Sequence, residues 1–297
     1  MTSNKKTPPQ QLHQPVLFGK TTTLLAPKKG ETYLDLTAGY GGHAREVIRR
    51  IGVANKATLV DQDAFAIQHL QDLASEGTRV IKRDYATAAQ DLAKAGEHFD
   101  MILVDLGVSS PQLDMAERGF SIVRPGQLDM RMDQSQQQTA ADLVNTASES
   151  ELTRIIRDYG EEPKARAIAR EIVKARPLHT TDELAAAVKQ VHRRVHTRVH
   201  PATRTFQAIR IALNDELGQL ERTLPLLPRL LRPGGRVAII SFHSLEDRLV
   251  KRFFKEQAES GYEAELQILT RRPIDGATED VHNPRARSAK LRAAVKK

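Results

Sequence analysis

Cysteine and long apolar runs are both missing from this sequence of 297 residues. Without cysteine the chain has no disulfide bond, no thiolate metal ligand and no thiol nucleophile, which fits a reducing compartment. The longest apolar runs, such as 101–104 and 237–240, are far too short to cross a bilayer. The amino-terminal residues contain no apolar segment of the signal-peptide type. We therefore expect a cytoplasmic protein that has no membrane partner.

Acidic side chains are missing from two further stretches, 186–210 and 282–297, which are rich in Lys and Arg. The formal net charge of the chain is +8, and the two stretches together outweigh it. Solvated surfaces ordinarily mix both signs of charge, so this pattern favours binding to a polyanion over a merely solvated face. We predict that phosphates of the polyanion contact Arg193, Arg194, Arg198, Arg204, Arg285 and Arg287.

Strand-like and helix-like segments alternate in the first third of the chain. Residues 1–12 are polar and lack an apolar period, so we predict a disordered leader. Beyond residue 13, amphipathic stretches separate short β-rich runs. These runs lie at 32–36, 57–60, 79–81 and 101–104. Such alternation is typical of βαβ units in a parallel sheet with both faces covered.

The alternation stops after Asp105, where a long segment of helix formers begins. Predicted helices in this part of the chain cover 149–159, 164–175, 181–194 and 206–231, and a strand follows at 236–241. The simplest architecture is an α/β, Rossmann-like domain made of residues 13–110 and 205–297. An inserted helical domain, 111–204, interrupts it.

A glycine loop follows the first predicted strand and precedes a predicted helix. It contains Gly39, Gly41 and Gly42. Glycines allow a tight turn and a close approach of ligand to backbone, and a helix N-terminus presents unpaired N–H groups. The loop also satisfies the G-x-G-x-x-A variant of the dinucleotide fingerprint, with Asp61 placed to bind a ribose hydroxyl. The glycines alone therefore leave both a methyl donor and NAD(P) open.

Acids at the predicted strand ends favour the methyl donor. The series is Asp35, Asp61, Asp63, Asp84 and Asp105. A carboxylate such as Asp35 beside the loop would repel a pyrophosphate, whereas S-adenosylmethionine has no phosphate and carries a cationic ammonium and a cationic sulfonium. Helix capping would explain one or two of these acids but not the whole series.

A set of motifs, in order, covers nearly the whole chain after residue 12. They are HQPVL at 13–17, GGH at 41–43, DLGVSSPQLD at 105–114, ERGFS at 117–121, LDMRMD at 128–133, YGEE at 159–162, TFQAIR at 205–210, SFHSLEDR at 241–248 and NPRARSAKLR at 283–292. On these motifs the chain resembles the MraW/RsmH family of bacterial 16S ribosomal RNA cytosine N4-methyltransferases.

The resemblance implies a methyltransferase fold and a set of contacts to S-adenosylmethionine. The implied contacts are Gly41, Gly42, His43, Asp61, Tyr85, Asp105 and Gln112, to which the loop analysis adds Asp35 and Gly39. Two departures from the family pattern stand out. Tyr85 replaces a frequent Phe while keeping the ring, and residues 124–127 replace an acidic-Gly-Pro sequence, which alters a loop beside the substrate.

The implied reaction methylates N4 of a cytidine in the decoding region of 16S rRNA. N4 is a poor nucleophile, so the enzyme must orient the amine, on a base reached in an unstacked form. Asp105 and His243 are our catalytic candidates, with two alternatives: Asp105 serves only the donor, and His243 is a structural residue. His192, His196 and His200 have helical spacing, but Pro201 and the neighbouring arginines favour RNA phosphates over zinc, and we predict no metal.

Two other functions and several details stay open at the level of sequence. The chain could be an NAD(P)-dependent oxidoreductase, as the glycine pattern allows, or a noncatalytic RNA-binding protein on a methyltransferase fold. The expected partner is 16S rRNA, either free or in the assembled small ribosomal subunit. The oligomeric state is open, with a homodimer among the alternatives, and so is the group that accepts the N4 proton.

Overall fold

A computed structural model of the protein describes residues 15–192 and 200–297. Two compact units share the chain. The first, the sheet unit, comprises the described residues up to 61 together with 65–106 and 223–297. The second, the helical unit, comprises 62–64 and the described residues of 107–222. The predicted leader, residues 1–12, lies outside the described residues.

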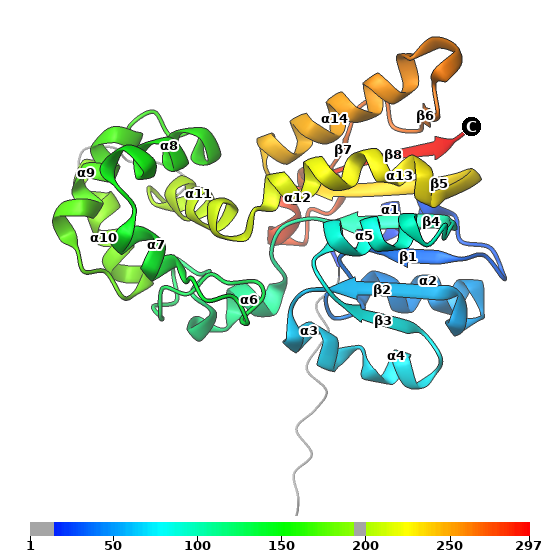
Figure 1. The fold of residues 1–297 in the computed structure, drawn as a ribbon, viewed down its shortest axis with the longest axis horizontal. Helices are drawn as coiled ribbons and strands as arrows, with labels where there is room; N and C mark the ends of the chain where they lie inside the picture. Colours follow the sequence, from blue (N-terminus) through cyan, green and yellow to red (C-terminus); the bar gives the residue numbers. More distant parts are fainter. Residues whose placement is uncertain (1–14, 193–199) are drawn as a thin grey trace, which may run out of the picture. The chain divides into compact units, whose positions relative to one another are not determined.

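One mixed sheet forms the centre of the sheet unit, with its strands in the order β3-β2-β1-β4-β5-β8-β6, and β7 pairs with β8 (Figure 1). The strands are β1 (Tyr33–Asp35), β2 (Ala57–Asp61), β3 (Arg79–Lys82), β4 (Phe99–Asp105), β5 (Leu231–Ser241), β6 (Leu266–Ile268), β7 (Ile274–Asp275) and β8 (Lys290–Lys296). Strands β1 to β5 are parallel, whereas β8 runs antiparallel to β5, β6 and β7. The predicted α/β class with a helical insertion is confirmed.

Helices pack on the sheet because its strands are apolar on both faces. Leu34, Ile102 and Val104 are fully buried, as continuous apolar strands of a covered parallel sheet should be. The helices of this unit are α1 (Phe18–Leu25), α2 (Gly42–Ile51), α3 (Ala64–His69), α4 (Gln71–Ser75), α5 (Tyr85–Lys94), α13 (Leu227–Leu230), α14 (Ser244–Glu259) and α15 (Gly276–Glu279).

The helical unit has its own apolar core. Its helices are α6 (Ser110–Asp114), α7 (Ala140–Thr146), α8 (Glu149–Gly160), α9 (Ala165–Ala175), α10 (Thr181–Val191), α11 (Thr203–Asn214) and α12 (Glu216–Thr223). Helix α8 shows why they form: Ser148 caps its N-terminus, and Leu152, Ile155 and Ile156 form a buried stripe at helical spacing. Because α11 packs along α8, the helical unit runs to Arg222, beyond the predicted boundary at 204.

Two predicted details were wrong. The single helix expected at 206–231 is broken, because Asp215 takes a left-handed conformation with φ 49° and because Pro225 and Pro228 start new short helical turns. Strand β5 begins at Leu231 instead of at 236, and residues 232–235 form an irregularity between the pairs Phe99–Leu231 and Met101–Arg236. Among the described residues, no helix is both long and apolar enough to cross a membrane.

Candidate active site

The glycine loop joins β1 to α2 with two left-handed residues, Gly39 at φ 52° and Gly41 at φ 79°. The amide of Gly39 donates a 2.8 Å hydrogen bond to Oδ2 of Asp61 at the end of β2, so this acid fixes the loop. Gly42 is required for a different reason, because a Cβ atom there would lie 2.5 Å from Cγ of Pro15. The chain segment before α1 therefore lies directly against the loop.

His43 follows the loop at the first turn of α2, and its side chain is buried. Its ring stacks on Phe18, with 5.7 Å between centroids, and it hydrogen-bonds to the backbone of Val16. Burial lowers the pKa of His43 to about 4, against the opposing effect of the Val16 hydrogen bond, so the ring is neutral near pH 7. Its Nε2 lies 3.8 Å from Oδ2 of Asp105 and has no hydrogen-bond partner in the described structure.

Asp35 and Asp105 occupy the carboxyl ends of β1 and β4. Oδ2 of Asp35 accepts a 2.7 Å hydrogen bond from the Tyr33 hydroxyl, and Oδ1 accepts one from the Thr37 amide. Burial, with the nearby charge of Asp61, raises the pKa of Asp35 to about 7 despite these hydrogen bonds. Neither acid forms an ion pair with Lys or Arg within the described residues.

Asp105 has the more extreme environment of the two. Burial first, and then the neighbouring charges of Asp35 and Glu246, raise its pKa well above the usual range. Its backbone amide donates to the Thr37 hydroxyl at 2.6 Å, while its Oδ1 is buried without a hydrogen-bond partner in the described structure. Buried polar groups are almost always satisfied in native proteins. The unpartnered atoms of His43 and Asp105, beside two acids that pair with no Lys or Arg among the described residues, therefore fit a ligand that brings donors and positive charge.

The other two acids of the predicted series have local roles. Asp84 caps α5 by accepting a 2.8 Å hydrogen bond from the Thr87 amide. Asp63 lies in the helical unit and pairs with Arg118 at 2.7 Å. Capping and ion pairing therefore explain two of the five acids, and Asp35, Asp61 and Asp105 are left as the candidates at the strand ends.

The remaining predicted ligand contacts come from two elements. Tyr85, half-buried, is the first residue of α5. Gln112 is a buried residue of α6 in the helical unit, and both ends of its amide are held: Oε1 accepts from the Ser109 amide at 2.9 Å and Nε2 donates to Oδ2 of Asp63 at 2.9 Å.

His243 serves as the N-cap of α14. Its Nδ1 accepts a long hydrogen bond of 3.4 Å from the Glu246 amide, and its Nε2 lies 3.2 Å from Oε1 of Glu246 without hydrogen-bond geometry. Glu246 in turn accepts from the amide of Phe242 at 2.7 Å. The imidazole is thus engaged in a capping box, as the structural alternative for His243 requires.

Not all charges of the two basic stretches are exposed. Arg193, Arg194 and Arg198 lie outside the described residues, whereas Arg204 and Arg287 are exposed and Arg285 is half-buried. Arg292 is buried in β8 and binds Asp247 of α14 through two hydrogen bonds of 2.7 and 3.1 Å. Lys296 donates to the carbonyls of Pro228 and Leu231. The end of the second stretch is therefore a paired interior strand as well as a basic segment.

Sequence reasoning missed the packing of Pro15, Val16 and Phe18 against the glycine loop and His43. It also missed the ion pair between Asp63 and Arg118. The ERGFS motif contained Arg118, but nothing in the sequence indicated a partner 55 residues earlier.

The sequence model of the MraW methylase family matches residues 10–297 of the chain. The relatives that match nearly the whole chain include three named ribosomal RNA small subunit methyltransferase H. The one from Synechocystis sp. is 48% identical and the alignment covers 92% of this chain and 89% of the relative. The one from Deinococcus radiodurans is 47% identical over 98% and 92%, and the one from Acidobacterium capsulatum is 44% identical over 97% and 99%. A solved rRNA methylase from Streptococcus thermophilus is more distant, with 10% identity, a TM-score of 0.43, and coverage of 96% of this chain and 98% of its own.

Proposed function

The chain belongs to the MraW methylase family, and we propose that it transfers a methyl group from S-adenosylmethionine to the exocyclic N4 of a cytidine in the decoding region of 16S rRNA. The relatives that match it nearly end to end are small-subunit rRNA methyltransferases by name. The structural observation that carries the proposal is the pair of buried polar atoms, Nε2 of His43 and Oδ1 of Asp105, that have no hydrogen-bond partner among the described residues.

These acids suit the proposed donor, which supplies the methyl group when bound and carries positive charge and an ammonium donor. We assign its binding to Gly39, Gly41, Gly42, His43, Asp61, Tyr85, Asp105 and Gln112. Asp61 is the acid for the ribose hydroxyls and Tyr85 the ring for the adenine. Asp35 has both oxygens occupied by Tyr33 and Thr37, so we assign it the task of holding the loop and adding negative potential. A pyrophosphate would be repelled here, which argues against NAD(P).

Asp105 is our candidate for orienting the acceptor amine. A base held beyond the carboxyl end of β4 would present its N4 hydrogens to a carboxyl oxygen that lacks a donor, and such alignment is the main requirement for a weak nucleophile. Asp105 is also the group that would hold the N4 proton, because burial and neighbouring charges raise its pKa, whereas the lowered pKa of His43 makes that ring a weak base. His243 would act on the base only after leaving its cap on α14, so we give it the smaller role.

The basic side chains supply the proposed contacts to RNA phosphates. Arg193, Arg194, Arg198, Arg204, Arg285 and Arg287 belong to this set. Neutralising Arg193, Arg194 and Arg198 together is expected to lower methylation and flatten its dependence on salt, because each phosphate contact releases counterions. Unchanged activity and unchanged salt dependence would remove these residues from the interface. We also propose a cytoplasmic location, since the proposed substrate is RNA of the small ribosomal subunit.

One experiment tests the whole assignment. The full chain is incubated with labelled S-adenosylmethionine and either unmethylated small ribosomal subunits or naked 16S rRNA, and the label is mapped to a nucleoside. We expect N4-methylcytidine. A protein that binds RNA and donor yet transfers nothing would be a noncatalytic binder. A thermal-shift comparison comes first: stabilisation by S-adenosylhomocysteine and not by NAD(P) is expected, and the reverse would favour an oxidoreductase.

A further inference from the structure

A three-residue segment of the helical unit, Met130 to Met132, has an unusual backbone. Met130 has φ 57°, in the left-handed region that side chains other than glycine seldom adopt. The segment belongs to no helix or strand. Strained conformations of this kind persist only where the surroundings over-determine them, and they concentrate at functional sites.

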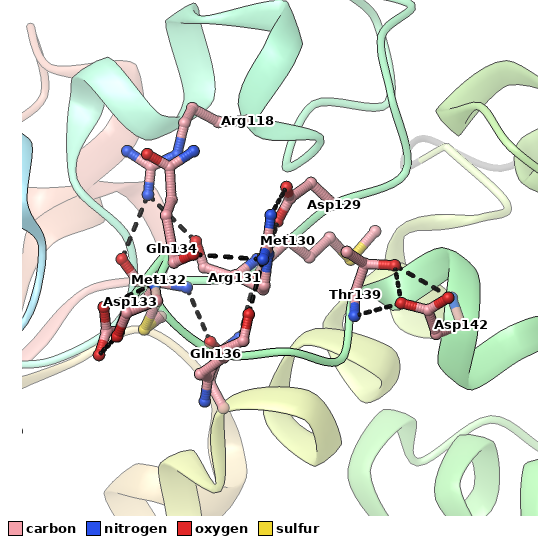
Figure 2. Close-up of polar contacts among 12 residues, drawn as sticks. Arg118, Asp129, Met130, Arg131, Met132, Asp133, Gln134, Gln136, Thr139 and Asp142 are labelled. Atoms are coloured by element: carbon pink, nitrogen blue, oxygen red, sulfur yellow. Dashed lines mark hydrogen bonds and ion pairs between the residues drawn. The ribbon is translucent and has the colours of Figure 1, made fainter.

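The surroundings of this segment do over-determine it (Figure 2). Met130 donates its amide to the Arg118 carbonyl at 3.0 Å and accepts from Nδ2 of Asn214 at 2.9 Å. The Met132 amide donates to Oδ1 of the same asparagine at 2.9 Å. The carbonyls of Arg131 and Met132 both accept from one guanidinium nitrogen of Arg118, at 3.1 and 3.3 Å.

The other guanidinium nitrogen of Arg118 connects this segment to the predicted donor contacts. It donates to Oδ2 of Asp63 at 2.7 Å, the same oxygen that accepts from the Gln112 amide. Both side chains of the ion pair are only 4% exposed. Asp63 is two residues after Asp61, and Gln62 between them contacts Sδ of Met132 at 3.3 Å. Within the helical unit, one buried guanidinium thus fixes residues 62–64, the Gln112 amide and the strained segment together.

We infer that Arg118 and Asp63 are positioning residues for the methyl donor, which set Gln112 and the chain beyond Asp61 in their binding conformation. This inference rests on the proposed function, since Gln112 and Asp61 are assigned to the donor there. A planar guanidinium can bind a carboxylate and two carbonyls at once, which a lysine ammonium does not reproduce with the same geometry. Preorganisation of this kind contributes affinity because the loop need not be ordered when the ligand binds.

The test compares Arg118→Lys and Asp63→Asn with a matched control, Arg236→Lys. Arg236 in the sheet unit also binds one carboxylate, that of Glu31, and two carbonyls, those of Leu25 and Ala26. It pairs with Met101 near the beginning of β4, away from the carboxyl ends of the parallel strands. Binding of S-adenosylhomocysteine to each full-length protein is measured by calorimetry. Thermal unfolding and steady-state kinetics with RNA are measured alongside.

We expect the two variants of the pair to weaken S-adenosylhomocysteine binding by about tenfold or more, as the loss of charge-assisted hydrogen bonds predicts. KM for the donor should rise by a similar factor, with kcat less affected. Arg236→Lys should lose thermal stability and keep its affinity. Equal affinity of wild type and both variants would overturn the inference. Should Arg118→Lys not fold, Asp63→Asn decides alone. Failure of the wild type to bind would instead refute the proposed donor.

Discussion

Buried carboxylates occur in two settings in this protein. In the sheet unit, Asp35 and Asp105 end parallel strands and form no ion pair with Lys or Arg in the part of the chain that the structure describes, and burial raises the pKa of both. In the helical unit, Asp63 and Asp129 are buried as well, but each binds an arginine, Arg118 or Arg131, at 2.7 Å. Burial acts to raise the pKa of Asp129 too, yet its hydrogen bonds to Arg131 lower the pKa overall.

The presence or absence of a basic partner distinguishes buried acids that belong to the protein's own packing from buried acids that are candidates for binding a ligand. A paired acid is compensated inside the protein, and removing its partner leaves a charge buried alone. Burying an acid without a basic partner lowers the stability of the folded state, and such groups concentrate at functional sites. Breaking a buried ion pair should therefore lower stability, with donor affinity also reduced where the pair positions Gln112, whereas replacing Asp35 or Asp105 should change activity more than stability.

The largest expected effect is on stability, from Arg118→Leu. Both members of this pair are 4% exposed, so the substitution leaves the Asp63 carboxylate buried without its guanidinium, with the Gln112 amide still bound to it. We expect the free energy of unfolding to fall by about 3–5 kcal/mol, as for other broken buried pairs. Urea denaturation of the full chain measures it. The double variant Arg118→Leu/Asp63→Leu should recover much of the loss, and a single variant as stable as wild type would refute the contrast.

Asp105→Asn should lower activity without lowering stability. With no arginine to lose, stability is expected to stay constant or rise, because an ionisable group leaves a buried site. The single-turnover rate with saturating donor should fall about 100-fold, the size typical of losing one group that orients or deprotonates a reactant. Rapid-quench methylation assays measure the rate. A variant with weaker donor binding and a normal rate would show that Asp105 serves the donor only.

Asp35 should make the stability of the protein depend on pH. Its pKa of about 7 in the folded protein lies above the ordinary 3.8, so the folded state holds a proton that the unfolded state releases. The stabilisation is complete below pH 4 and is lost as the pH rises toward 7. Asp35→Asn should remove a slope of up to about 1.4 kcal/mol per pH unit across this range. The pKa of His43 is about 4 in the folded protein, below its ordinary value of 6.5, so His43 makes stability increase with pH between these two values. The effect of Asp35 is therefore measured as the difference in stability between wild type and Asp35→Asn at each pH.

The local parts of this structure were predictable from the sequence, and the long-range pairs were not. The predicted strand at 57–60 is β2, Ala57–Asp61, and the predicted helix at 149–159 is α8, Glu149–Gly160. Each has a local signal, a buried apolar run in one case and a capped apolar stripe in the other. The location of acids such as Asp35 and Asp105 at one edge of the sheet was also predictable, because the carboxyl ends of parallel strands lie at the same edge.

Strand β8 shows why the remainder could not be predicted. Its sequence, KLRAAVK, has one β-branched residue and three basic ones, so it matched a basic tail. It is an interior antiparallel strand because β5 and β6 pair with it on its two sides, and Arg292 is tolerated there because Asp247 lies 45 residues away in sequence but 2.7 Å away in space. Asp63 and Arg118 pose the same difficulty. Composition identifies the charges, and only the fold identifies which are neutralised.

The smallest expected effect concerns two arginines near the carboxyl end, where β8 has shown that basic residues need not face solvent. Arg287 is exposed and Arg285 half-buried, and neither forms part of the Asp247 pair. Arg285→Gln/Arg287→Gln should weaken RNA binding at all sequences alike and reduce the slope of log affinity against log salt by about 2, one for each lost phosphate contact. Affinity is measured by filter binding between low and moderate salt. Arg292→Gln is the contrasting variant: it should lower stability and leave the salt slope unchanged, because its charge is already neutralised by Asp247. If Arg292→Gln changed the slope as much as the double variant does, pairing with Asp247 would not be what keeps Arg292 from contributing to RNA binding.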